Sequence, residues 1–214
     1  DKHMEYMLKT DDLVGVSFWI ISVAMVASTA FFFLEGNSVA KHWQTSVRVA
    51  GLVTLIAAVH YYYMRAVWIQ TGENPNVYRY IDLLLTVPLQ MVEFYLILAA
   101  IAVVKSSLFC RLLIASVVML VAGYLGEVGS INVWVGFVIG MLGWLYIIYE
   151  IFAGEASQIN ASKGSAASQK AFNALRLIVT IGWAIYPIGY VIGYTGGGSA
   201  EGINIIYNLS LIHI

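Results

Sequence analysis

Three ionisable side chains, Arg79, Asp82 and Glu93, lie within an otherwise apolar stretch of the chain, residues 77–100. The stretch is long enough to cross a lipid bilayer, which requires roughly 20 apolar residues in a helix. Ionisable groups are costly inside a bilayer, and they usually mark a path for ions or protons. These three side chains are therefore the first candidates for function.

The spacing of the charges predicts that they share one face of a helix. Arg79, Asp82, Thr86, Gln90 and Glu93 follow one another at steps of three or four residues, which a helix aligns on one side. Asp82 and Glu93 are about three turns apart, or roughly 16 Å along the axis. Arg79 lies one turn from Asp82 and is expected to pair with it.

Two carboxylates separated in this way suit proton transfer in series. Burial favours the protonated form of a carboxyl group, whereas a nearby cation favours the ionised form. Asp82, beside Arg79, is therefore expected to ionise more readily, and Glu93, among apolar neighbours, to stay protonated. The alternative is a structural role. Arg79 and Asp82 would form an ion pair that stabilises a helix bundle, and Glu93 would line a hydrated cytoplasmic crevice.

The overall composition predicts a membrane protein that could hold such a helix. Hydrophobic residues make up 60% of the 214 positions and charged residues only 11%, with a mean hydropathy of +0.81. Soluble domains carry about 25% charged residues. The net charge of -1 argues against nucleic acid as a partner. The single cysteine excludes an internal disulfide, and no histidine or cysteine pair has ligand spacing, so no metal site is expected.

Seven apolar segments predict an all-α fold, a seven-transmembrane-helix bundle formed by a single domain over residues 1–214. The predicted spans cover residues 13–34, 45–69, 77–104, 108–127, 131–153, 171–194 and 202 onward. The longest polar break, residues 154–170, is rich in Ser, Gly and Asn and is predicted to be a loop. Glu127 and Glu150 lie near the ends of predicted spans and are expected to be interfacial.

Positive charges predict the orientation of the bundle. The basic residues that flank the first, third and fifth loops are Lys41, Arg48, Lys105, Arg111, Lys163, Lys170 and Arg176. The second, fourth and sixth loops contain Glu73, Glu127 and Glu201 but no Lys or Arg. Because positively charged loops stay in the cytoplasm, the N-terminus is predicted to lie outside. Asp82 then lies in the outer half of the membrane and Glu93 in the cytoplasmic half.

The run YRYID-x-LLTVPLQ-x-x-EFYLILAA resembles the third helix of the proteorhodopsins, retinal-binding, light-driven proton pumps of marine bacteria. GLVTLIAAVHYYYMRAVWI, GWAIYPIGY and NIIYNL also match, and together these segments extend the resemblance over most of the chain. The resemblance implies an outward proton pump rather than an enzyme, with bound all-trans retinal. It also implies a multi-pass protein of the bacterial inner membrane, surrounded by lipid and assembled as a homo-oligomer, a pentamer or hexamer.

The same resemblance implies roles for the polar residues. Asp82 would accept the Schiff-base proton as its counter-ion, Thr86 would tune it, and Glu93 would be the proton donor that restores it. Arg79 and His60 would tune the acceptor, with His60 as its partner in the second helix. A lone histidine in a membrane is otherwise more often a satisfied hydrogen-bonding group than a ligand, although it titrates near neutral pH.

A retinal pocket is likewise implied. Its predicted wall residues are Leu83, Gln90, Trp144, Trp183, Tyr186, Pro187 and Tyr207. Gln90 matches the position where blue-absorbing members carry Gln and green-absorbing members carry Leu. Leu83 stands where the family has a Trp against the retinal, and the smaller side chain would leave a cavity that costs a few kcal/mol.

The family binds retinal through a lysine of the seventh helix, since only an amine forms a Schiff base. In NIIYNLSLIHI the alignment places that lysine just after Ile214 and puts Leu211 where the family has a second counter-ion Asp. Two alternatives to a lysine beyond Ile214 remain. In the first, the sequence of the tail is misassigned from about Ser210; in the second, the chain is truncated and inactive.

Two other functions remain open. A photosensor would share the fold and the cofactor but signal through a partner protein, and the presence of Glu93 argues against it. A retinal-free seven-helix transporter would leave Gln90 and the aromatic sixth helix unexplained.

Overall fold

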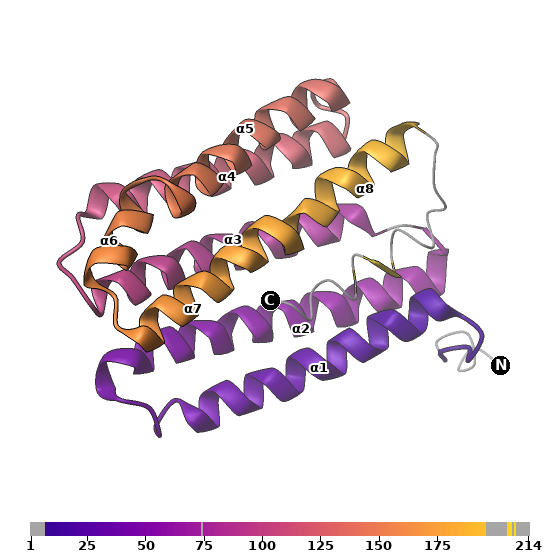
Figure 1. Cartoon of the computed structure of the whole chain (residues 1–214). Helices are drawn as coiled ribbons and strands as arrows, with labels where there is room; N and C mark the ends of the chain where they lie inside the picture. Colours follow the sequence, from indigo (N-terminus) through magenta and orange to yellow (C-terminus); the bar gives the residue numbers. More distant parts are fainter. Residues whose placement is uncertain (1–6, 74, 196–204, 207, 209–214) are drawn as a thin grey trace.

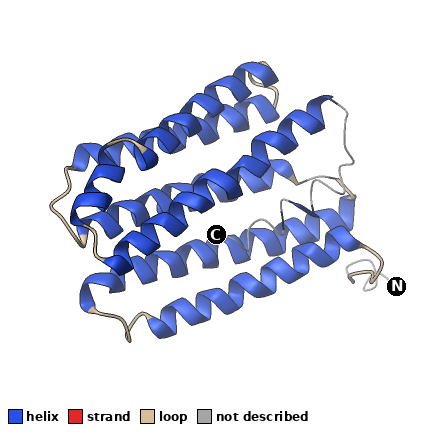
Figure 2. Cartoon of the chain, in the orientation of Figure 1, coloured by secondary structure: helices blue, strands red, loops and turns tan. Residues whose placement is uncertain are grey.

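The fold was analysed in a computed structural model, which describes residues 7–73, 75–195, 205–206 and 208. All regular structure within these ranges is helical (Figures 1 and 2). The helices are α1 Leu13–Glu35, α2 Gln44–Thr71, α3 Asn76–Ala99, α4 Ser106–Glu127, α5 Val133–Phe152, α6 Glu155–Lys163, α7 Ala166–Leu177 and α8 Trp183–Thr195. A 3-10 turn, η2 Lys41–Trp43, precedes α2, and a π-helical turn, η3 Ile178–Gly182, joins α7 to α8.

Six helices of the described chain are long and apolar enough to cross a membrane. They correspond to the first six predicted spans: α1, α2 with its 3-10 turn, α3, α4, α5 continued by α6, and α7 continued through the π turn into α8. Most of the seventh predicted span, residues 202 onward, lies outside the described residues. The three residues of this span that the structure describes, 205, 206 and 208, are helical.

The prediction of a loop over residues 154–170 was wrong, because α6 and the start of α7 occupy most of it. Ser165 caps α7 by accepting a hydrogen bond from the backbone N–H of Ser168. Glu155 in the first turn of α6 and Lys163 in its last turn complement the helix dipole. The polar segment therefore forms helices rather than a loop. The third span was also predicted too long, since α3 ends at Ala99 instead of residue 104.

Consecutive helices pack side by side from α1 to α5, and α3 lies within the bundle (Figure 1). Helices α4 and α5 approach closely at glycines: a Cβ on Gly136 would lie 2.6 Å from the carbonyl oxygen of Ala122, and one on Gly143 would lie 2.9 Å from that of Ala115. Small residues allow this contact between backbones in membrane helices. Large apolar side chains such as Val23, which is half exposed, cover the outside of the bundle, as expected of a surface that faces lipid.

Helix α3 turns a polar face into the bundle. Arg79, Asp82, Thr86 and Gln90 are each at most 5% exposed, although the outer surface of the bundle is apolar. This confirms the predicted alignment of these residues on the inner side of one helix. Glu93 continues the line and is partly buried.

Candidate functional site

Asp82 is fully buried, and neither of its carboxylate oxygens has a hydrogen-bond partner among the described residues. The nearest basic group is the imidazole of His60 on α2, whose Nδ1 lies 3.6 Å from Asp82 Oδ1. His60 Nδ1 is also 2.9 Å from the carbonyl oxygen of Ile56. Because a carbonyl oxygen only accepts, a hydrogen bond to it requires the tautomer with a proton on Nδ1. The structure thus brings the predicted acceptor and its predicted partner together.

Thr86 is placed one turn from Asp82 by α3, as predicted. Its hydroxyl donates a 3.1 Å hydrogen bond to the backbone carbonyl of Asp82. This bond stays within the helix, as is common for threonine in apolar surroundings. Thr86 therefore fixes its own side chain without occupying the carboxylate of Asp82.

Arg79 joins four segments of the chain. Its Nη1 donates to the hydroxyl of Tyr61 on α2 at 3.1 Å and to Oδ1 of Asn208 at 3.0 Å. Asn208 Nδ2 in turn donates to Ser17 Oγ on α1 at 2.9 Å. Arg79 also lies over the rings of Tyr61 and Phe18. All five side chains are buried, so the guanidinium is solvated by the protein itself.

Sequence reasoning missed Tyr61, Ser17 and Asn208. Tyr61 directly follows His60, and Ser17 lies in an apolar segment, but neither position indicates by itself that the side chain faces Arg79. Asn208 lies within the motif NIIYNL, where a buried amide in an apolar segment is itself a sign of a hydrogen-bonded partner.

Glu93 lies towards the other end of α3, beside a small cavity of about 30 Å³. Thr54 of α2 and Gln90 also line this cavity. Glu93 Oε1 and both amide atoms of Gln90 lack hydrogen-bond partners within the described chain. A cavity of this volume with several polar atoms has room for about one or two water molecules. The structure therefore places Gln90 next to the predicted donor.

A larger cavity of about 360 Å³ lies between α3, α4, α5 and α8. Five of the seven predicted wall residues line it: Leu83, Trp144, Trp183, Tyr186 and Pro187. Trp144 is held in place by a 2.9 Å hydrogen bond from its Nε1 to the carbonyl oxygen of Val179 in the π turn. Gln90 is not among the residues that line this cavity, and Tyr207 lies outside the described residues.

The large cavity and the site around Asp82 fit the predicted cofactor. Aromatic and aliphatic side chains make most of the wall, as an apolar polyene requires. Asp82, next in sequence to the wall residue Leu83, is a buried carboxylate whose oxygens form no hydrogen bond in the described structure. Such a group is suited to a cationic partner, since an unpaired buried charge is strongly unfavourable.

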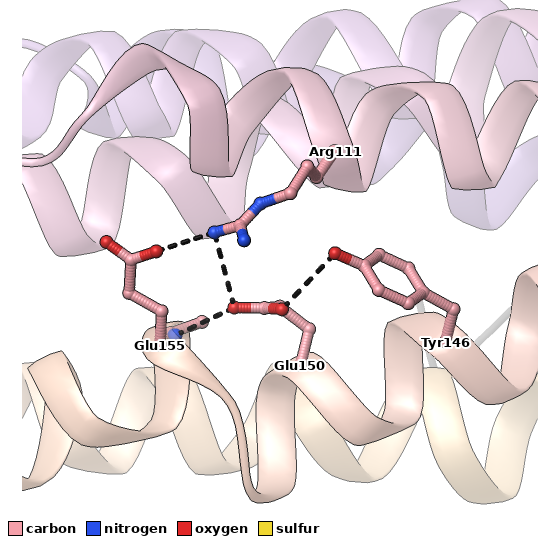
Figure 3. A network of polar contacts seen from close by, with 5 residues as sticks. Arg111, Tyr146, Glu150 and Glu155 are labelled. Atoms are coloured by element: carbon pink, nitrogen blue, oxygen red, sulfur yellow. Dashed lines mark hydrogen bonds and ion pairs between the residues drawn. The ribbon is translucent and has the colours of Figure 1, made fainter.

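Glu150 lies near the end of α5, as predicted, and its side chain is only 3% exposed. Figure 3 shows the polar groups around it. Its Oε1 accepts from the backbone N–H of Ala156 at 3.3 Å and lies 3.9 Å from Arg111 Nη2, while Tyr146 donates to its Oε2 at 3.4 Å. Arg111 also contacts Glu155 at 2.5 Å. The start of α6 and Arg111 of α4 thus contact this buried carboxylate, and the sequence did not predict α6.

Comparisons with known proteins agree with this geometry. The family model of bacteriorhodopsin-like proteins matches residues 12–210. A green-light absorbing proteorhodopsin from Gamma-proteobacterium EBAC31A08 is 54% identical over 205 residues, 95% of this chain and 82% of the relative. A blue-light absorbing proteorhodopsin from Gamma-proteobacterium Hot 75m4 is 54% identical over 206 residues, with the same two coverages.

Solved structures show the same similarity in three dimensions. The crystal structure of a blue light-absorbing proteorhodopsin from Med12 superposes with a TM-score of 0.80 at 55% identity, covering 93% of this chain and 90% of that chain. The structure of xanthorhodopsin, described as a light-driven ion pump with dual chromophore, gives a TM-score of 0.81 at 29% identity, covering 92% and 85%. By sequence and by fold, the chain belongs to the bacteriorhodopsin-like protein family.

Proposed function

We propose that the chain is a light-driven proton pump that moves protons outward across the bacterial inner membrane. The observation that carries the proposal is the placement of two carboxyl groups along the inner face of α3, with Asp82 buried beside His60 and Glu93 three turns away. The similarity to green- and blue-light absorbing proteorhodopsins supports a retinal protein.

All-trans retinal is the proposed cofactor, bound as a protonated Schiff base to a lysine expected just after Ile214. Leu83, Trp144, Trp183, Tyr186 and Pro187 would hold it, since all five line the large cavity. When bound, retinal supplies light absorption and, after isomerisation, a transferable proton. The protein supplies the groups that receive, replace and direct that proton.

Asp82 is the proposed proton acceptor and counter-ion. An ionised carboxylate with no hydrogen bond to the described residues has both oxygens available for a proton. His60 Nδ1, at 3.6 Å, and Arg79, one turn away, stabilise the charge that Asp82 carries before it accepts. Thr86 keeps the backbone at Asp82 in place through its bond to the carbonyl oxygen.

Glu93 is the proposed donor that restores the proton from the cytoplasmic side. The small cavity beside Glu93 and Gln90 has room for the water that a proton would need on its way. The outward direction follows from the orientation predicted by the basic loops, with the N-terminus outside. Asp82 then faces the outer half of the membrane and Glu93 the inner half. The assembly is proposed to be a homo-oligomer of five or six subunits in lipid.

The test begins with the protein expressed from its own gene to the natural stop codon, with all-trans retinal supplied. We expect a visible absorption band that hydroxylamine bleaches under light, and illuminated cells that acidify their medium until a protonophore is added. Only the near-ultraviolet band of free retinal would contradict the cofactor assignment. A pigment with a slow photocycle that leaves the pH of the medium unchanged would instead indicate a photosensor.

A further inference from the structure

The large cavity extends from its aromatic wall to the end of the bundle where α3 begins and where α4 and α8 end. Arg79 lines its middle, and Asn76, Glu127 and Tyr194 line its far end. Each of these last three residues lies at or next to the end of its helix. A single space therefore connects the proposed cofactor pocket with one membrane surface.

Glu127 is held at this end by one hydrogen bond to each carboxylate oxygen. Tyr194 donates its hydroxyl to Oε2 at 2.8 Å, and Asn76 donates its side-chain amide to Oε1 at 3.0 Å. Glu127 is partly exposed at the end of α4 and lines the cavity there. It is the one carboxylate among the described residues that line the cavity.

A proton accepted by Asp82 must still leave the protein on the side of Arg79. Arginine cannot relay it by losing a proton, because the guanidinium stays charged in proteins. Tyr80, Tyr190 and Tyr194 also line the cavity, but a phenol ordinarily ionises only near pH 10. A glutamate side chain ordinarily ionises near pH 4.3 and can take up and lose a proton under physiological conditions.

We propose that Glu127 is the proton-release relay of this chain, on the outer side of the cavity. The inference rests on the proposed pump function. A proton leaves the Asp82 carboxyl group, passes Arg79, which lines the cavity one turn away, crosses the cavity on water and bonds to a carboxylate oxygen of Glu127. It then passes from that oxygen to bulk water, which restores the Glu127 carboxylate and leaves Asp82 ionised for the next cycle.

A purely structural role for Glu127 makes a different prediction. The same hydrogen bonds connect α3, α4 and α8. In a purely structural role, Glu127 would stabilise the packing of these helices and relay no proton. Glu127→Gln keeps the size of the side chain and a carbonyl oxygen for Tyr194, but it cannot relay a proton. Tyr194→Phe keeps the carboxylate and removes one of the two hydrogen bonds. The two variants therefore separate the relay from the structural role.

The experiment is flash photolysis of the purified pigment with a pH-indicator dye. The delay is measured between the colour change that reports protonation of Asp82 and the arrival of the proton in the medium. We expect Glu127→Gln to lengthen this delay about a hundredfold or more, as for loss of a positioned acid–base group. Its visible band and thermal midpoint should match those of the parent protein. Tyr194→Phe and the control Glu73→Gln, at an exposed site, should keep the parental delay.

A second readout needs no bound retinal. Infrared difference spectra between two pH values, recorded in the dark, should contain a carboxyl band that Glu127→Gln removes and Glu73→Gln leaves in place. That result would mean that Glu127 exchanges protons with the medium.

Three results would overturn the inference: a parental delay in Glu127→Gln, equal delays in Glu127→Gln and Tyr194→Phe with lowered thermal midpoints, or no Glu127 band in the infrared titration. Absence of a visible band in the parent protein would instead contradict the proposed function, and the infrared titration would still show whether Glu127 exchanges protons with the medium.

Discussion

The guanidinium of Arg79 and the side-chain amide of Asn208 are 3.0 Å apart, although 129 residues separate them in the sequence. Asn208 also donates to Ser17, so this contact ties the last described helical residue to α1 and α3 together. A buried arginine is stable only when the protein replaces its water. The C-terminal segment therefore helps to hold the charge next to the proposed acceptor.

Replacing Asn208 by Leu should destabilise the protein, because a buried guanidinium loses an acceptor. The expected loss is about 1.5–3 kcal/mol, as for a hydrogen bond to a charged group. Ser17→Ala, which removes only the neutral bond to Asn208, should cost about 1 kcal/mol. Unfolding in detergent mixtures measures both values. Equal stability of Asn208→Leu and the parent protein would show that Arg79 does not depend on this contact.

Asp82→Asn should abolish pumping and shift the visible band to longer wavelength. The carboxylate stabilises the positive charge that the chromophore carries in its ground state, and the amide does not. Acidification of the parent protein should produce the same shift, since protonation neutralises Asp82 and leaves no acceptor. Spectra and light-induced acidification measure both effects. An Asp82→Asn variant that still pumps with an unshifted band would disprove the assignment.

Glu93→Gln should leave the first proton transfer to Asp82 unchanged and slow the return of a proton to the site. The expected decrease in the return rate is on the order of a hundredfold, the lower end of the contribution of a positioned acid–base group. Time-resolved absorption separates the two steps. A parental return rate would exclude Glu93 as the donor.

Gln90→Leu should move the absorption maximum to longer wavelength while pumping persists. The resemblance to green-absorbing members, which carry Leu at this position, predicts the direction. The absorption spectrum measures the shift, and Gln90→Glu, which keeps a polar side chain of similar size, serves as the comparison. An unchanged maximum would mean that Gln90 belongs to the small cavity beside Glu93 and does not tune the chromophore.

Glu150→Ala should lower the stability of the end of the bundle where α5 meets α6. The backbone N–H of Ala156 is buried and would lose its acceptor, at a cost of about 1–3 kcal/mol. Glu150→Gln retains a carbonyl oxygen and should have a much smaller effect. Thermal unfolding of the two variants tests whether Glu150 acts as a cap for α6 or mainly through the charge of Arg111.

The sequence predicted the parts of this structure that depend on local pattern. Helical spacing alone identified the polar face of α3, and hydropathy identified six spans. The resemblance supplied the five wall residues that line the large cavity. Hydropathy could not predict α6, because it measures transfer into lipid and not the tendency to form a helix. It also could not predict that the start of α6 contacts Glu150, since such a contact depends on how the segments fold together.

The contacts of Arg79 were beyond sequence reasoning for a related reason. The sequence indicated the neighbour one turn away, Asp82, but Tyr61 and Asn208 reach Arg79 from other segments. Such contacts depend on how helices rotate against each other. A buried charge in one helix therefore predicts that partners exist, and the fold determines which ones they are.

The π turn at residues 178–182 has a consequence for how the sixth span tolerates change in length. One extra residue in a regular helix rotates everything that follows by about 100°, which would turn an inward face outward. A π turn absorbs that extra residue within a few positions. Helices α7 and α8 thus keep their inward faces aligned across the turn, and Trp144 contacts the turn by donating a hydrogen bond to the carbonyl oxygen of Val179. Deleting one residue within this turn should therefore give a continuous α-helix whose two halves keep their inward faces, whereas the same deletion within α8 would rotate the residues beyond it by about 100°.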